Sequence, residues 1–165
     1  MSDPVQTTPA RKLRFHILRH DPRDPTSLSG DTVNALLEDR EGALWIATVG
    51  AGLDRYVPER GEFLHYPPNP QDPTALSDGW VHTVYEDSRG MLWVATRMGL
   101  NRYDPEKNAF TRFLTQVDDP QSLGGNQALA LLEAVEDVSI LAAPGHSSFA
   151  KSNFQSIQDL LIGHC

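Results

Sequence analysis

The chain has little of three things that would widen its range of functions: cysteine, positive charge and long apolar runs. Its single cysteine, Cys165, rules out an internal disulfide. Its formal net charge is −8, so it lacks the excess of clustered lysine and arginine that nucleic acids and anionic membranes attract. We therefore expect neither a nucleic acid nor a membrane as its partner.

Signals for export or membrane insertion are also missing from the sequence. No apolar run reaches the roughly 18 residues that a membrane span requires. Residues 1–12 are polar and contain proline, without the apolar stretch of a signal peptide, and we expect them to be a disordered N-terminus. Taken by itself, the sequence predicts a cytoplasmic location.

What the sequence does contain is a long internal repeat. Residues 38–48 read Glu-Asp-Arg-Glu-Gly-Ala-Leu-Trp-Ile-Ala-Thr, and residues 86–96 read Glu-Asp-Ser-Arg-Gly-Met-Leu-Trp-Val-Ala-Thr. The acidic pair ends one extended segment, and the glycine completes a tight turn because it adopts positive φ at little cost. The Leu-Trp-(Ile/Val) run then predicts a buried strand. Two such hairpins at a fixed spacing indicate a repeat architecture.

The repeat extends beyond this motif. Phe15, Phe63 and Phe110 are equivalent, at offsets of 48 and then 47 residues. Each is followed by a loop that contains Asp-Pro, a pair that disfavours helix and promotes turns. The first of these phenylalanines lies in Leu13–His20, which we expect to be a leading outer strand.

Each repeat unit is predicted to contain four short strands. Four antiparallel strands in 40–50 residues, with a tryptophan on the second, are typical of a β-propeller blade. The expected strands are Thr32–Glu38, Ala43–Thr48, Leu53–Val57 and Phe63–Tyr66 in the first unit, and Trp80–Glu86, Met91–Thr96, Leu100–Tyr103 and Ala109–Leu114 in the second.

Taken together, these motifs resemble the two-component regulator propeller repeat over residues 13–125. That family combines Asp-Pro-x-Ser-Leu-Ser loops with Glu-Asp-x-x-Gly-x-Leu-Trp and then Gly-Leu-x-Arg-Tyr, which stands here at residues 52–56 and 99–103. The resemblance implies a partial β-propeller with two full blades, residues 31–66 and 79–113. It also implies a sensory module that binds a ligand or a protein.

Residues 126–165 follow a different pattern, and we expect them to form an α/β tail. The tetrapeptide Ala-Leu-Leu-Glu of residues 35–38 returns at residues 130–133, but the rest of the motif does not follow. Either a third blade begins here and stops after its first strand, or the tetrapeptide is a coincidence at a junction. Helix-forming composition predicts a helix near 127–136 and helical spacing another near 153–163, with a strand at 138–142 between them. The expected fold is therefore mainly β with a small helix-strand-helix segment.

The tail supports two further hypotheses about function. Residues 128–165 resemble the α/β core of contractile phage tail sheath proteins, which implies a structural subunit or a fragment of one. The abrupt end of the repeat also fits a chimeric or truncated reading frame that has no independent function.

Catalysis is not supported by the residue pattern. The acidic pairs at 38–39 and 86–87 are expected to form turns, since no partner acid faces them across a cleft. The six histidines show no metal-ligand spacing. We therefore expect no enzyme activity, no cofactor and no metal. Residues expected to form the repeat core are Trp45, Trp93, Phe15, Phe63 and Phe110.

A binding surface is the remaining functional expectation. In a propeller, the loop entering the first strand and the loop after the second strand share one face. This places Trp80, His82 and Arg97 close together, either as a contact site for a ligand or partner or as local packing at a blade edge. Two blades also leave open sheet edges, so we expect the chain to associate with itself or with another propeller-containing chain.

Overall fold

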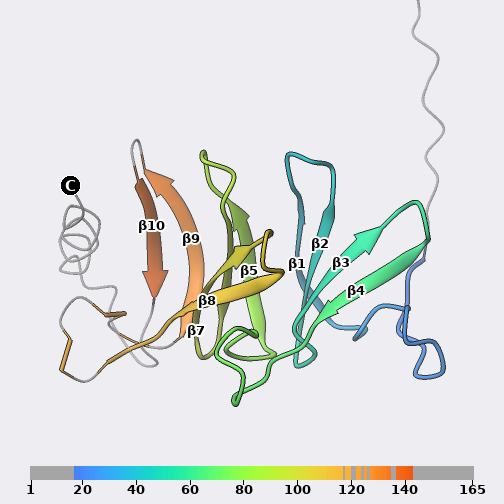
Figure 1. Ribbon diagram of the computed structural model, residues 1–165, viewed down its shortest axis with the longest axis horizontal. Coiled ribbons are helices and arrows are strands. Elements are labelled where there is room, and N and C mark those ends of the chain that lie inside the picture. The colour runs from blue at the N-terminus through green and yellow to red at the C-terminus, as the bar shows by residue number, and fades with distance from the viewer. Residues whose placement is uncertain are drawn as a thin grey trace, which may run out of the picture.

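The computed structural model describes residues 17–116, 118–119, 122–123, 125, 127–134 and 137–142. Within these residues the chain forms strands in three antiparallel sheets and no helix. Figure 1 shows the sheets standing side by side in chain order, and each sheet packs against the next one in sequence. This arrangement confirms the mainly β prediction.

Two of the sheets have four strands each, arranged in sequence order as in propeller blades. Every strand end lies within one residue of its prediction. Blade 1 contains β1 (Val33–Glu38), β2 (Leu44–Thr48), β3 (Leu53–Val57) and β4 (Glu62–Tyr66). Blade 2 contains β5 (Val81–Glu86), β6 (Leu92–Thr96), β7 (Gly99–Asp104) and β8 (Ala109–Phe113).

The turn between the first two strands of each blade explains the repeated motif. Asp39 accepts hydrogen bonds from the Ala43 amide at 2.8 Å and from the indole Nε1 of Trp45 at 2.8 Å. Asp87 makes the same two contacts with Met91 and Trp93 in blade 2. The glycine in each turn has a positive φ angle, 82° at Gly42 and 80° at Gly90, which only glycine adopts without strain. The aspartate of each acidic pair therefore has a structural role in its turn.

The main core lies between the two blades. We call the side of a blade that carries its tryptophan the forward face, and the opposite side the rear face. The forward face of blade 1 packs on the rear face of blade 2, where Val81 and Val94 are fully buried. Trp45 is 2% exposed and lies with its ring centroid 5.1 Å from that of Tyr103.

The other predicted core residues are less uniform. Phe63 and Phe110 are buried on the rear faces of their blades, whereas Trp93 is only partly buried. Trp93 faces a smaller cluster formed with Phe113 and the beginning of the third sheet, which covers less of the ring. Phe15 lies outside the described residues.

The third sheet corrects the predicted tail. The helix predicted near 127–136 is wrong where the structure describes it: residues 128–134 form β9 (Ala128–Ala134), which pairs antiparallel with β10 (Asp137–Ala142), and β10 contains the predicted strand at 138–142. The Ser88 amide donates to Glu133 at 2.9 Å, as the Arg40 amide donates to Glu86 at 2.9 Å one blade earlier. The repeated tetrapeptide thus begins a third blade-like unit. It forms a strand and not a helix because strand pairing and packing override helix propensity. The helix predicted near 153–163 lies outside the described residues.

The predicted leading strand is also wrong where the structure describes it. Residues 17–20 form no strand, and Ile17 is 76% exposed. Instead of pairing with a sheet edge, His20 donates its amide to Asp31 at 2.9 Å and places its ring against the carbonyl of Leu28. Residues 13–16 and the expected disordered segment 1–12 are outside the described part of the chain.

Candidate binding site on the loop face of blade 2

Trp80 and Arg97 meet at one end of blade 2. Trp80 directly precedes β5 and Arg97 directly follows β6, and these strands pair antiparallel with Val81 opposite Thr96. The Arg97 amide donates to the Trp80 carbonyl at 3.1 Å. The guanidinium carbon of Arg97 lies 5.5 Å from the centroid of the Trp80 ring, within the range of a cation–π contact.

Asp78, which the sequence analysis missed, fixes this pair. One of its carboxylate oxygens accepts the Trp80 amide at 2.8 Å, and the other lies 3.1 Å from Nη2 of Arg97. The acid therefore positions both the backbone that carries the indole and the cation that lies on it. Comparing the two repeats position by position would have revealed it, because blade 1 has Gly30 at the equivalent position.

His82 belongs to the same electrostatic environment. Burial lowers the pKa of His82 below its ordinary value of 6.5, and of the two nearby charges Asp78 raises it while Arg97 lowers it. The ring is therefore neutral at neutral pH. Its Nε2 atom is buried and has no hydrogen-bond partner among the described residues. A neutral imidazole with an unused ring nitrogen can accept or donate one hydrogen bond.

The cluster remains open to solvent despite these contacts. Trp80 is 41% exposed, and the side chain of Arg97 is 54% exposed. An exposed cation–π pair contributes only about 0.5–1 kcal/mol, so stability alone gives little reason for it. The uncovered part of the indole presents a rigid apolar surface with an arginine, an acid and a histidine beside it.

The repeat itself does not require these four residues. The equivalent positions in blade 1 are Gly30, Thr32, Asn34 and Val49. Blade 1 nevertheless has the same strand order and the same irregularity in its first pairing. The four side chains are therefore a feature of blade 2 and not of the fold.

The arginines of the Gly-Leu-x-Arg-Tyr motif make structural contacts. Arg55 lies over Trp45 at 5.4 Å, and Arg102 lies over Trp93 at 6.0 Å. The two arginines thus cover the two repeat tryptophans. Within the described residues, no three metal-ligating side chains gather, and no helix is long and apolar enough to cross a membrane.

The repeat units have a recognisable family origin. Residues 27–50 and 75–98 match the sequence model of a family described as two component regulator propeller. These two segments are similar to two-component regulator propeller repeats. The matched segments run from the loop before the first strand to the end of the second strand in each blade, so they include the Asp-x-x-Gly-x-Leu-Trp turn.

Solved structures support the same relationship. The extracellular domain of the hybrid two-component system BT3049 from B. thetaiotaomicron is 26% identical, with a TM-score of 0.63, over 75% of this chain. The extracellular domain of BT4673 from the same organism is 27% identical, with a TM-score of 0.57, over 73% of this chain. The chain spans only 19% and 17% of those two structures. No curated protein matches it.

Proposed function

We propose that the chain is a non-enzymatic binding module of the propeller sensor type. Two observations support this proposal: the repeats of the two-component regulator propeller family, and the similarity to extracellular domains of two-component systems. Propeller sensor domains of such systems are non-catalytic binding modules. The similar structures also favour an extracytoplasmic location over the cytoplasmic one that the sequence alone predicted. Protease accessibility in intact cells tests the location.

The loop-face cluster is the proposed contact site. Its support is one observation: an exposed Trp80 is held by Asp78 and Arg97 beside a neutral His82, and blade 1 lacks the whole set. A rigid aromatic side chain next to an arginine is the type of surface that dominates binding energy in interfaces. Local packing is the competing explanation, and it predicts no ligand effect at these positions.

Thermal-shift screening with a panel of neutral, cationic and anionic small molecules tests the site. A ligand present at 100 times its dissociation constant stabilises the folded state by about 2.7 kcal/mol, a shift of roughly 5–10 °C. The shift should disappear in Trp80→Ala and remain in Thr32→Ala, the matched position in blade 1. Equal shifts in both variants would place binding elsewhere.

The tail-sheath alternative loses its main support. The resemblance implied an α/β core in residues 128–165, whereas residues 128–134 form β9, which pairs with β10. The contact between Ser88 and Glu133 relates this segment to the preceding blades instead.

The rear face of blade 1 supports the expected association between propeller blades. Val33 is 41% exposed and Leu36 is 63% exposed, whereas the equivalent Val81 and Val84 of blade 2 are 0% and 7% exposed. Glu38 is exposed, although its equivalents Glu86 and Glu133 each accept an amide from the preceding blade. We infer that this face accepts another blade of the same repeat type.

Sedimentation velocity measures this association. The chain should associate with itself at tens of micromolar, and Leu36→Asp should shift it toward the monomer because the new charge lies in the contact. Leu64→Asp is the matched control, since Leu64 is also 45% exposed on blade 1 but lies on the forward face. A monomeric wild type would contradict the inference.

A further inference from the structure

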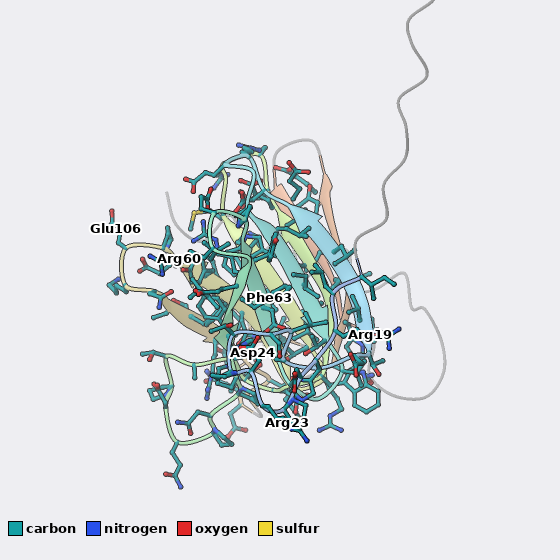
Figure 2. All side chains as sticks on the ribbon, turned by 90° about the vertical axis from the view of Figure 1, so that its right-hand side faces the viewer. Arg19, Arg23, Asp24, Arg60, Phe63 and Glu106 are labelled. Atoms are coloured by element: carbon teal, nitrogen blue, oxygen red, sulfur yellow. The ribbon has the colours of Figure 1, made fainter. Side chains whose placement is uncertain are left out.

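Each blade is preceded by a loop that lies against its own rear face. The loops span residues 21–30 and 69–78, and each places one leucine, Leu28 or Leu76, in a buried position. In the first loop, the carbonyl oxygen of Thr26 accepts a hydrogen bond of 2.8 Å from the amide of Phe63. Figure 2 looks onto this face, with Phe63 of β4 and Asp24 of the loop near each other. The loop therefore helps to cover the apolar rear side of blade 1.

In blade 2 an arginine holds the loop. Arg112 of β8 donates to four loop carbonyls at 2.6–2.9 Å, those of Asn69, Asp72, Ala75 and Leu76. The neighbouring strand contributes Asn101, whose side-chain oxygen accepts the Ser77 amide at 3.0 Å. Arginine remains protonated at every pH at which proteins are folded, so these contacts do not depend on pH.

In blade 1 the same position is a histidine. Nδ1 of His65 lies 2.7 Å from Oδ1 of Asp54, and Nε2 lies 2.9 Å from the Pro25 carbonyl. Asp54 is fully buried, and its other oxygen accepts the Ser29 amide at 2.8 Å. The pair His65–Asp54 thus stands where blade 2 has Arg112 and Asn101.

The proton count of this arrangement is fixed by its acceptors. A carbonyl oxygen only accepts, so the Nε2 atom of His65 must carry a hydrogen. The short contact between Nδ1 and Asp54 requires a second proton, whichever of the two atoms holds it. When the pair loses one proton, His65 has a single N–H for two acceptors. It must then leave either the carbonyl of Pro25 or the buried carboxylate.

We propose that His65 makes the loop of residues 21–30 a proton-operated latch. Closing the latch is linked to proton binding, because the closed form needs one more proton on the pair than the open form, so the closed loop is favoured at low pH and opens as pH rises. Opening uncovers Ile46 and Phe63, which pack with Leu28 in the closed form. The loop of residues 69–78 stays closed throughout.

Other charged groups near the loop do not account for such a switch. The ring of His20 lies against the Leu28 carbonyl at 2.7 Å, but this contact needs one hydrogen, which the neutral ring has. Contacts with Thr26 lower the pKa of Asp24, so that carboxylate stays ionised over the whole range. Asp21 and Arg23 are exposed on the loop, outside the pair.

Hydrogen exchange of the intact chain at pH 5.5 and 8.5, corrected for the intrinsic rates, tests the latch. Protection of residues 21–30 should fall at least about tenfold at the higher pH, the effect of losing one charge-assisted hydrogen bond. Residues 69–78 of the same molecule are the internal control and should not change. Binding of an apolar dye should increase in parallel as Ile46 and Phe63 become accessible.

A double variant, Asp54→Asn with His65→Arg, copies the pair of blade 2 into blade 1. It should keep residues 21–30 protected at both pH values, whereas His20→Gln should leave the pH dependence of the wild type intact. The proposal is overturned if wild-type protection does not change with pH, if both loops open together, or if the double variant still responds.

Discussion

The bond between Asp39 and Trp45 allows a sharp test of how the repeat motif stabilises a blade. Asp39 accepts three hydrogen bonds, from the amides of Glu41 and Ala43 and from the indole of Trp45. In Asp39→Asn the oxygen that faces the indole becomes, in one orientation, an NH₂ group that cannot accept. The amide of the exposed Glu41 can turn to water, but Ala43 and Trp45 are buried at 8% and 2% exposure.

Each buried donor without a partner costs about 1–3 kcal/mol. In either orientation one buried donor loses its acceptor, so we expect Asp39→Asn to lower the free energy of unfolding by about 1–3 kcal/mol, measured by urea denaturation. Glu41→Gln, in the same turn but at an exposed position, should change it by less than about 0.5 kcal/mol.

A double-mutant cycle isolates the indole contribution. Trp45→Phe removes the N–H while keeping an aromatic ring, so the cost of Asp39→Asn in that background should fall by about 1–2 kcal/mol. A coupling energy below about 0.5 kcal/mol would refute the assigned role of the carboxylate.

Three further predictions follow from burial and contact. Urea denaturation should show that Trp45→Ala costs about 3–5 kcal/mol and Trp93→Ala less, because Trp93 is only partly covered. Hydrogen bonds from the preceding blade lower the pKa of Glu133 below its ordinary value of 4.5. The amides of β9 should therefore be protected from hydrogen exchange above pH 4.5, and they should lose protection as the pH falls through the lowered pKa of Glu133. A Glu133→Gln variant should lack this acid response. Gly79→Ala should lower the melting temperature, because the new Cβ would lie 2.5 Å from the Gly50 carbonyl oxygen. A melting temperature equal to that of the wild type would contradict this close approach.

Most of the blade architecture could be predicted because it depends on local sequence. Turn chemistry at Gly42 and Gly90 fixes where each first hairpin reverses, and alternation along the strands fixes which side chains share a face of the sheet. The same logic located Trp80 and Arg97 at one end of blade 2 from topology alone. Asp78 was missed because its role depends on the side chain of Arg97, which no local pattern specifies.

The tail could not be predicted from propensity. Its alanine, leucine and glutamate residues favour helix in isolation, but β9 has the forward face of blade 2 beside it and β10 to pair with. The deciding signal was Glu133, whose carboxylate reaches the turn of the preceding blade as Glu86 does. A repeated residue with an interblade contact was better evidence than the composition around it.

Differences between the repeats carry the functional argument, because the shared residues are already used by the fold. The two blades share the turn acids, the buried tryptophan strand and the loop leucine. They differ where blade 2 has the exposed Trp80 and where blade 1 has His65 in place of Arg112. The fold needs no solvent-exposed indole. It also needs no titratable side chain on β4 to hold the loop, because Arg112 holds the equivalent loop of blade 2. These positions are therefore where substitution should change binding or pH response while leaving the strands intact.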